Sequence, residues 1–263
     1  LPPPAKPRNA TASRASATQR AGRAGRLREG LCVRLYDRFD FEHRAAFDVP
    51  ELQRTELSGV ILDLAAMGVS VPAAFPWLEP PPAVSLQEAQ VLLQRLGAVT
   101  SQGALTDRGR RMAGFPVAPR QARFLAEIES ITKEPLLRQA ACRLTALIGE
   151  ERAQGQDLLH ELERYRPEGG AKRLVERLEK ALGVSGGGSR RLDSKGEVLM
   201  ARALLAGYPD RVGRVRGGKG SARRQGTGRT MELVLSGGGS AQAADDALTR
   251  AHEYFVVVEA QGT

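Results

Sequence analysis

The stretch from Pro119 to about Leu182 constrains the fold most, because its apolar residues recur at helical spacing along its whole length. Gly183 and the glycines at 186–188 predict a flexible break after it. One more helix is expected beyond the break, ending at Gly207. The chain is therefore predicted to be mainly α-helical, with helices over 119–130, 134–149, 155–164, 170–182 and about 191–206.

Upstream of this stretch, helical patterns alternate with a short β-structure. Helices are expected over 48–68 and 85–97, and Ser85 and Glu88 in the second have the spacing of a capping box. The residues AVTSQGALT that follow predict a short hairpin, and Thr106 is expected to be the N-cap of the next helix. Two helices, the stiff connector FPWLEPPP and a short β-wing predict a winged-helix unit.

Short strand-like runs separated by glycine replace the helical pattern after Gly207. The runs DRVGRVRGG, RTMELVLSGGG and EYFVVVEA predict a small β-barrel that stops just after a strand. Near the other end, residues 30–36 place Leu31, Val33 and Leu35 in alternation, which is the period of a strand. Strands are therefore expected on both sides of the helical region.

Composition excludes several classes of protein. Cys32 and Cys142 are too few for a disulfide framework or a zinc site, and the three histidines have no ligand spacing, so no metal site is expected. No apolar run approaches the roughly 18 residues that a membrane span needs. Residues 1–13 lack the apolar core of a secretory signal and are rich in proline and polar residues. A cytoplasmic protein with a disordered N-terminal segment is expected.

The charge is unevenly distributed. The net charge is +9, and residues 1–34 hold 8 Lys and Arg against 1 acid. Residues 190–229 hold 11 against 3, so the rest of the chain is net acidic. Two basic segments favour a polyanionic partner, and a solvated face or a disordered tail is the alternative for each.

The segment QRAGRAGR, residues 19–26, carries three arginines and two glycines. A helix is expected over 14–26, on which Gln19, Arg23 and Arg26 would lie within an arc of about 60°. Each glycine costs about 1 kcal/mol relative to alanine there, and like charges add a small penalty. A sequence that tolerates both is expected to present cations to an anion, and guanidinium groups suit phosphate oxygens. A helix bound to nucleic-acid backbone and a merely solvated helix are the alternatives.

Several segments together carry a resemblance to a known family. QRAGRAGR resembles motif VI of the DEAH-box helicases of superfamily 2. The segments PELQRTELSGVILDLAAMG, FPWLEPPP and ALTDRGRRMAGFPVAPRQARFL resemble the stretch that follows motif VI, in the same order and spacing. YPDRVGRVRGG resembles a later segment of the bacterial HrpB branch. The resemblance covers roughly residues 14–260.

The resemblance implies a multidomain fragment. Its expected parts are a disordered segment 1–13, the remnant of a second RecA-like α/β domain 14–47 and a winged helix 48–105. A helical ratchet domain 106–188 and a basic helix with a partial OB-like β region 189–263 would follow.

The resemblance also implies a nucleotide site. In such helicases ATP and Mg²⁺ lie between two RecA-like domains, and motif VI comes from the second. By similarity, Arg23 and Arg26 are the arginine fingers that face the γ-phosphate. The remaining residues implied to contact the nucleotide are Gln19, Arg20, Gly22 and Gly25.

A single-stranded nucleic acid, with RNA favoured by the resemblance, is the expected polyanion. Aromatic residues make up only 5% of the chain, which favours contact with the backbone over base stacking. The candidate contacts are Arg108, Arg111, Arg120, Arg123, Arg211, Arg214, Arg216 and Lys219. A solvated helix face is the alternative for each.

The resemblance fails in one respect. The chain contains no G-x-x-x-x-G-K-[ST] and no DEAH, and residues 1–13 resemble nothing in the family. The chain is therefore predicted not to hydrolyse ATP alone and to need the missing RecA-like domains or a partner helicase. A stand-alone, non-catalytic module that binds nucleic acid or a helicase is the second hypothesis, and a degraded remnant is the third.

Overall fold

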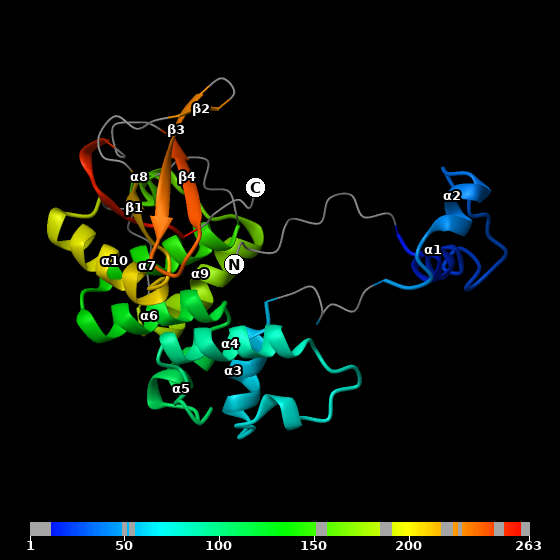
Figure 1. Ribbon diagram of the computed structural model, residues 1–263, viewed down its shortest axis with the longest axis horizontal. Coiled ribbons are helices and arrows are strands. Elements are labelled where there is room, and N and C mark those ends of the chain that lie inside the picture. Colours follow the sequence, from blue (N-terminus) through cyan, green and yellow to red (C-terminus); the bar gives the residue numbers. More distant parts are fainter. Residues whose placement is uncertain are drawn as a thin grey trace. The chain divides into compact units, whose positions relative to one another are not determined.

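The computed structural model (Figure 1) describes residues 12–48, 52, 56–150, 157–184, 191–216, 223–225, 228–244 and 250–258. The contacts divide the chain into an N-terminal unit, residues 2–56, and a larger unit that begins at Leu57. Each unit is described by itself.

Two short helices make up the regular structure of the N-terminal unit. They are α1 (Arg14–Ala21) and α2 (Arg38–His43), capped by the side chains of Ser13 and Asp37. The strand expected over 30–36 is not formed, and Leu35 in that segment is 96% exposed. The prediction was wrong because a strand needs a neighbour to pair with, and the described part of this unit offers none.

The larger unit begins with helices joined by a short hairpin. They are α3 (Ser58–Ala66), the 3₁₀ turn η2 (Pro72–Ala74), α4 (Ala83–Arg95) and α5 (Asp107–Ala113). The expected hairpin is confirmed by a bridge between Val99 and Leu105. The helix expected over 48–68 is described only from Ser58, since most of 49–55 lies outside the described residues.

One helix cap in this region is confirmed and one is wrong. The Thr106 hydroxyl accepts a bond from the Gly109 amide at 2.9 Å, as expected for the N-cap of α5. The capping box at Ser85 is not formed, because α4 already begins at Ala83, directly after Pro82. Gly109 is required by packing, since a Cβ there would lie 2.0 Å from the Ala98 carbonyl oxygen. The start of α5 is thus fixed against the hairpin.

Five helices follow, and they confirm the helical pattern after Pro119. They are α6 (Pro119–Ile131), α7 (Pro135–Gly149), α8 (Leu158–Arg164), α9 (Gly169–Ala181) and α10 (Ser194–Gly207). Helix α6 packs against α10 and α7, and α7 packs against α8 and α9. The apolar stripes meet in a core that includes the fully buried Phe124, Ile128, Leu144, Leu178 and Met200.

A small antiparallel sheet ends the described chain (Figure 1). Its strands are β1 (Val212–Val215), β2 (Arg223–Gln225), β3 (Gly228–Leu235), β4 (Ser240–Ala244) and β5 (Tyr254–Val256). β3 pairs with β4 along one edge and with β2 and β1 along the other, and β5 pairs with β1. The expected strands are confirmed, whereas closure into a barrel is not seen among the described strands.

Candidate nucleotide-contacting segment and nucleic-acid interface

The arginine-rich segment 19–26 lies at the end of α1. The helix stops at Ala21, and Gly22 is its C-cap. The chain continues in turns, with bonds from Arg23 N to Arg20 O at 3.2 Å and from Ala24 N to Ala21 O at 3.1 Å. A helix through residue 26 was therefore a wrong expectation, because the glycines that disfavour a helix also end it. Arg23 and Arg26 do not share a helix face with Gln19.

The polar side chains of this segment point to solvent. Gln19, Arg20, Arg23 and Arg26 are exposed, and none of their side chains has a hydrogen bond or ion pair with another described residue. A Cβ at Gly25 would meet nothing within 4 Å. The segment therefore offers unpaired donors to an external anion, beside a glycine that the described chain leaves uncovered.

The predicted strand contacts Arg108 and Arg111 on α5 differ in their surroundings. Arg108 is exposed, and one of its guanidinium nitrogens would lie 2.8 Å from a Cβ at Gly97. Arg111 binds both carboxylate oxygens of Glu129, at 2.5 and 3.0 Å, and donates to the Ala181 carbonyl oxygen at 2.7 Å. Arg108 is thus available to a strand, whereas Arg111 joins α5 to α6 and α9.

The next two predicted contacts, Arg120 and Arg123 on α6, are also engaged within the protein. Arg123 pairs with Glu127 at 2.9 Å, and its side chain is 11% exposed. Arg120 binds both carboxylate oxygens of Asp210, at 2.6 and 2.8 Å, and these side chains are 16% and 19% exposed. The second pair links α6 to the turn that enters β1.

Removal of the Arg120–Asp210 pair should produce a pH-dependent loss of stability. Burial alone would raise the pKa of Asp210, but Arg120, a backbone donor and Arg211 outweigh it and hold that pKa below its usual value. Arg120→Met should lower the free energy of unfolding by about 2 kcal/mol at pH 7, measured by urea denaturation. The pKa of Asp210 is lower in the folded chain than in the unfolded chain. The difference in unfolding free energy between Arg120→Met and the unchanged chain should therefore be complete above about pH 4 and vanish as the pH falls through the folded-state pKa.

Asp210→Asn and the double variant complete a double-mutant cycle for this prediction. The coupling between the two residues should also disappear in acid. A difference between Arg120→Met and the unchanged chain that is equally large at acidic and neutral pH would show that the arginine acts through packing and not through the pair.

The remaining predicted contacts belong to the sheet region. Arg211 donates to the Val258 carbonyl oxygen at 2.8 Å. Arg214 pairs with Glu253 at 2.8 Å and Arg216 with Glu232 at 3.0 Å, although both arginine side chains stay about two-thirds exposed (64% and 66%). Lys219 lies outside the described residues. The two exposed arginines can reach a strand from the surface of the sheet.

A group of bases that the sequence patterns did not single out lies on α9. The apolar residues Ala171, Val175 and Leu178 are buried, so the opposite face of the helix is exposed. That face carries Lys172, Arg173, Arg177 and Lys180. The helical period 171, 175, 178 was a sufficient signal for this face, but a search for basic runs along the chain misses bases that only a helix brings together.

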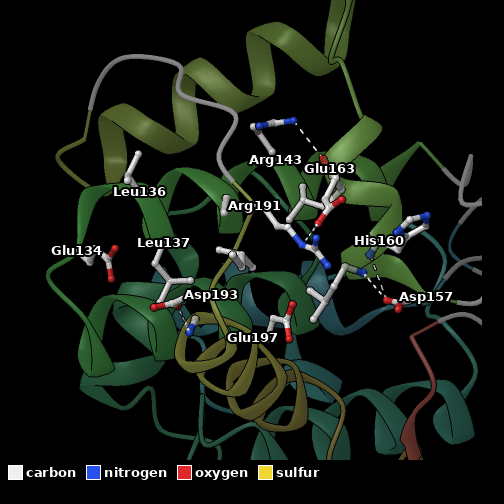
Figure 2. Close-up of a pocket in the computed structure, with 15 residues that line it drawn as sticks. Glu134, Leu136, Leu137, Arg143, Asp157, His160, Glu163, Arg191, Asp193 and Glu197 are labelled. Carbon is white, nitrogen blue, oxygen red and sulfur yellow. Dashed lines mark hydrogen bonds and ion pairs between the residues drawn. The ribbon is translucent and has the colours of Figure 1, made fainter. Parts of the chain in front are cut away.

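A pocket of about 370 Å³ lies between α7, α8 and the N-terminal end of α10 (Figure 2). Two of its acidic residues act as helix caps, Asp157 at the start of α8 and Asp193 at the start of α10. Arg191 and Glu163 point toward each other there and pair at 3.2 Å. None of the residues predicted to contact ATP or nucleic acid lines this pocket.

The described residues form neither a cluster of metal ligands nor a helix suited to a membrane. No group of three or more His, Cys, Asp or Glu side chains in the described ranges is arranged to hold a metal ion. Within the same ranges, no helix combines the length and apolar character required to cross a membrane.

Comparison with known proteins places this geometry in a family. The model of the helicase-associated domain (HA2), winged-helix, matches residues 89–117. The ATP-dependent RNA helicase HrpB of Escherichia coli (strain K12) is 34% identical over 245 residues, which cover 93% of this chain and 27% of HrpB. HrpA of the same organism is 43% identical over 140 residues, which cover 51% of this chain and 10% of HrpA.

A solved structure agrees with the sequence relatives. The crystal structure of the Escherichia coli DEAH/RHA helicase HrpB matches with a TM-score of 0.67 and 34% identity, over 92% of this chain and 28% of that one. The chain thus spans little more than a quarter of the length of HrpB. The chain is homologous to the DEAH-box RNA helicase HrpB over most of its length and to HrpA over about half of it, and it contains their helicase-associated winged-helix domain.

Proposed function

We propose that this chain is the C-terminal portion of an ATP-dependent RNA helicase, in which it supplies motif VI and part of the strand-binding surface. The observation that carries the proposal is the segment 19–26, whose polar side chains are exposed and unpaired among the described residues. Homology to the ATP-dependent RNA helicase HrpB over 93% of the chain supports ATP-dependent RNA unwinding as the reaction. We place the protein in the cytoplasm, as its sequence predicts.

Arg23 and Arg26 would act as arginine fingers. ATP hydrolysis builds negative charge on the transferred phosphoryl group, and a guanidinium that reaches it from another domain stabilises that charge. Gln19 and Arg20 are proposed to bind the remaining phosphate oxygens, while Gly22 and Gly25 leave room for the opposing surface. A Mg²⁺ ion would neutralise phosphate charge, and its ligands would come from the domain that holds the P-loop and DEAH motifs.

The larger unit is proposed to follow the RNA strand through its backbone. Arg108, Arg214 and Arg216 are the predicted contacts whose guanidinium groups are exposed. Contacts of this kind are sensitive to salt and insensitive to sequence. The sheet, proposed to begin an OB-like region, would extend this surface, and Lys219, which lies outside the described residues, remains a proposed contact. Arg214 and Arg216 would exchange their ion pairs with Glu253 and Glu232 for phosphate. The predicted contacts that are less exposed and would likewise have to leave partners within the protein are Arg111, Arg120, Arg123 and Arg211.

A chimera tests this function. This chain replaces the matching region of Escherichia coli HrpB, and ATP hydrolysis is measured with and without single-stranded RNA. The chimera should hydrolyse ATP with stimulation by RNA, whereas the chain alone and HrpB without its matching region should not. A folded chimera without RNA-stimulated hydrolysis, or hydrolysis by the chain alone, would contradict the proposal.

A non-catalytic module that binds nucleic acid or a helicase is the second candidate. The larger unit buries a core of its own, with Phe124, Leu144 and Leu178 inaccessible to solvent, and could bind a strand without ATP. RNA binding by the chain together with an inactive chimera would support this candidate over the first.

A further inference from the structure

The exposed side of α9 is a cationic surface held by a rigid support. At the helical period, Lys172, Arg173, Arg177 and Lys180 lie within an exposed arc of about 140°. None of the four has a hydrogen bond or ion pair with another residue in the described part of the chain. They extend over about 12 Å of the helix axis, which is the length of a few nucleotides. Together these four residues form the α9 face.

The support of the α9 face is buried and anchored at its end. Ala171, Val175 and Leu178 are buried, and α9 packs on α7. Arg111 donates to the Ala181 carbonyl oxygen at 2.7 Å, and Arg138 donates to the Leu182 carbonyl oxygen at 3.0 Å. Since the apolar side of α9 is already used in the core, the helix cannot insert that side into a bilayer.

The charge of the α9 face selects a polyanion. Glu176 is the acidic residue that shares the exposed arc, so the arc keeps a net charge of +3. Glu179 lies at its edge, where burial and repulsion from Glu176 raise its pKa and the Arg143 charge partly offsets the rise. Like charges three or four residues apart on a helix, such as Arg173 and Arg177, cost stability unless an anion compensates them. A sugar–phosphate backbone supplies that compensation without any base contact.

We propose that the α9 face binds the phosphate backbone of single-stranded RNA. The surface differs from the predicted contacts on α5, on α6 and in the sheet region, and the choice of RNA over other nucleic acids rests on the proposed function. Lys172 and Lys180 act as point charges, while Arg173 and Arg177 donate in forked pairs to phosphate oxygens. Binding through this face requires no ATP and no nucleotide-binding domain.

The test is RNA binding by the full chain, measured by fluorescence anisotropy with a labelled oligouridine over a series of salt concentrations. The variant carries Lys172→Gln, Arg173→Gln, Arg177→Gln and Lys180→Gln. Its affinity should fall about tenfold near 0.1 M salt, and the slope of log K against log[salt] should flatten by about 0.7 for each phosphate that the variant no longer neutralises. Circular dichroism checks that the variant keeps its helical content.

A matched variant controls for net charge. It carries Arg95→Gln, Lys133→Gln, Arg164→Gln and Lys195→Gln, which remove four exposed bases elsewhere on the same unit. It should keep the affinity of the unchanged chain within about twofold. Equal losses in both variants would overturn the proposal, since they would show a general charge effect.

Removal of the single acid on the arc, Glu176, should have the opposite effect on RNA binding. Glu176→Gln raises the net charge of the α9 face and should tighten RNA binding, with a steeper salt slope. Weaker or unchanged binding would contradict the proposal. So would binding of the chain to vesicles of anionic phospholipid that the four-site α9 variant loses while its RNA affinity is unchanged, because the partner would then be a lipid surface.

The RNA-binding test of the α9 face and the ATP-hydrolysis test of the chimera can succeed or fail separately. If the four α9 substitutions weaken RNA binding while the chimera is inactive, the surface is real and the helicase function is wrong. If the chimera is active and the α9 variant binds RNA normally, the helicase function stands and this surface does not contribute to it.

Discussion

Replacing Arg26 with alanine in the HrpB chimera should lower the turnover number for RNA-stimulated ATP hydrolysis about a thousandfold, the lower end of what an arginine finger contributes. The structure excludes a folding explanation for such a loss, because the Arg26 side chain is exposed and has no partner among the described residues. Its deletion therefore costs the fold nothing in the described contacts. Arg23→Ala should have a comparable effect for the same reason.

The kinetic pattern separates a finger from a binding residue. A group that meets charge developing on the phosphoryl group lowers kcat, whereas one that only binds ATP raises KM. Arg26→Ala should therefore act mainly on kcat, and Arg26→Lys should recover only part of it, because an ammonium lacks the planar fork.

Arg28→Ala is the matched control, because Arg28 is an exposed base just beyond the segment. It should keep the activity of the chimera within about twofold. Equal activity of the Arg26→Ala and Arg28→Ala chimeras would show that the residues of motif VI were assigned wrongly.

At the end of α1, the residue types predict a chemical partner, but they do not predict the local backbone geometry. The residue types of QRAGRAGR pointed to a phosphate partner whether or not they lay on a helix. The helical arc was a separate assumption, and the chain leaves the helix at Gly22 because its first turns bury only Ala17. With so little burial, the helical propensity of glycine decides where the helix ends.

Elements that bury an apolar stripe were predictable, and elements that depend on distant partners were not. The helices α6, α7 and α9 follow directly from the spacing of Phe124, Leu144, Leu178 and similar residues. The strand pattern at 30–36 has the right period but no pairing edge within the described part of its unit. Burial within a unit therefore decides whether a local pattern is realised.

Ion pairs were the second limit of prediction. Asp210 follows Arg120 by 90 residues and Glu129 follows Arg111 by 18, so neither ion pair can be predicted from local sequence spacing. The sequence identified these arginines as free bases for a strand, whereas the fold gives each a carboxylate. On α9 the opposite holds, because four bases without a described partner come together only through the helix.

Another arginine with a partner far away in the sequence is Arg138 on α7, which is 9% exposed. Its guanidinium donates to three backbone carbonyl oxygens, those of Glu129 at 2.9 Å, Thr132 at 3.0 Å and Leu182 at 3.0 Å. These carbonyls lie at the C-terminal ends of α6 and α9, where the helices leave acceptors without intrahelical donors. One buried cation thus caps two helices and compensates the negative ends of their dipoles.

Arg138→Met should lower the free energy of unfolding by about 3 kcal/mol, because it keeps the bulk of the side chain but leaves three buried or part-buried backbone acceptors without their charged donor. Urea denaturation followed by circular dichroism measures the change. Arg95→Met on the exposed side of α4 is the control and should stay within about 0.5 kcal/mol of the unchanged chain. Arg138→Lys should fall between the two, since an ammonium cannot reach three divergent carbonyls at once. If Arg138→Met were as stable as the control, water would have to satisfy these helix ends, and the guanidinium would not be what holds α6 and α9 together.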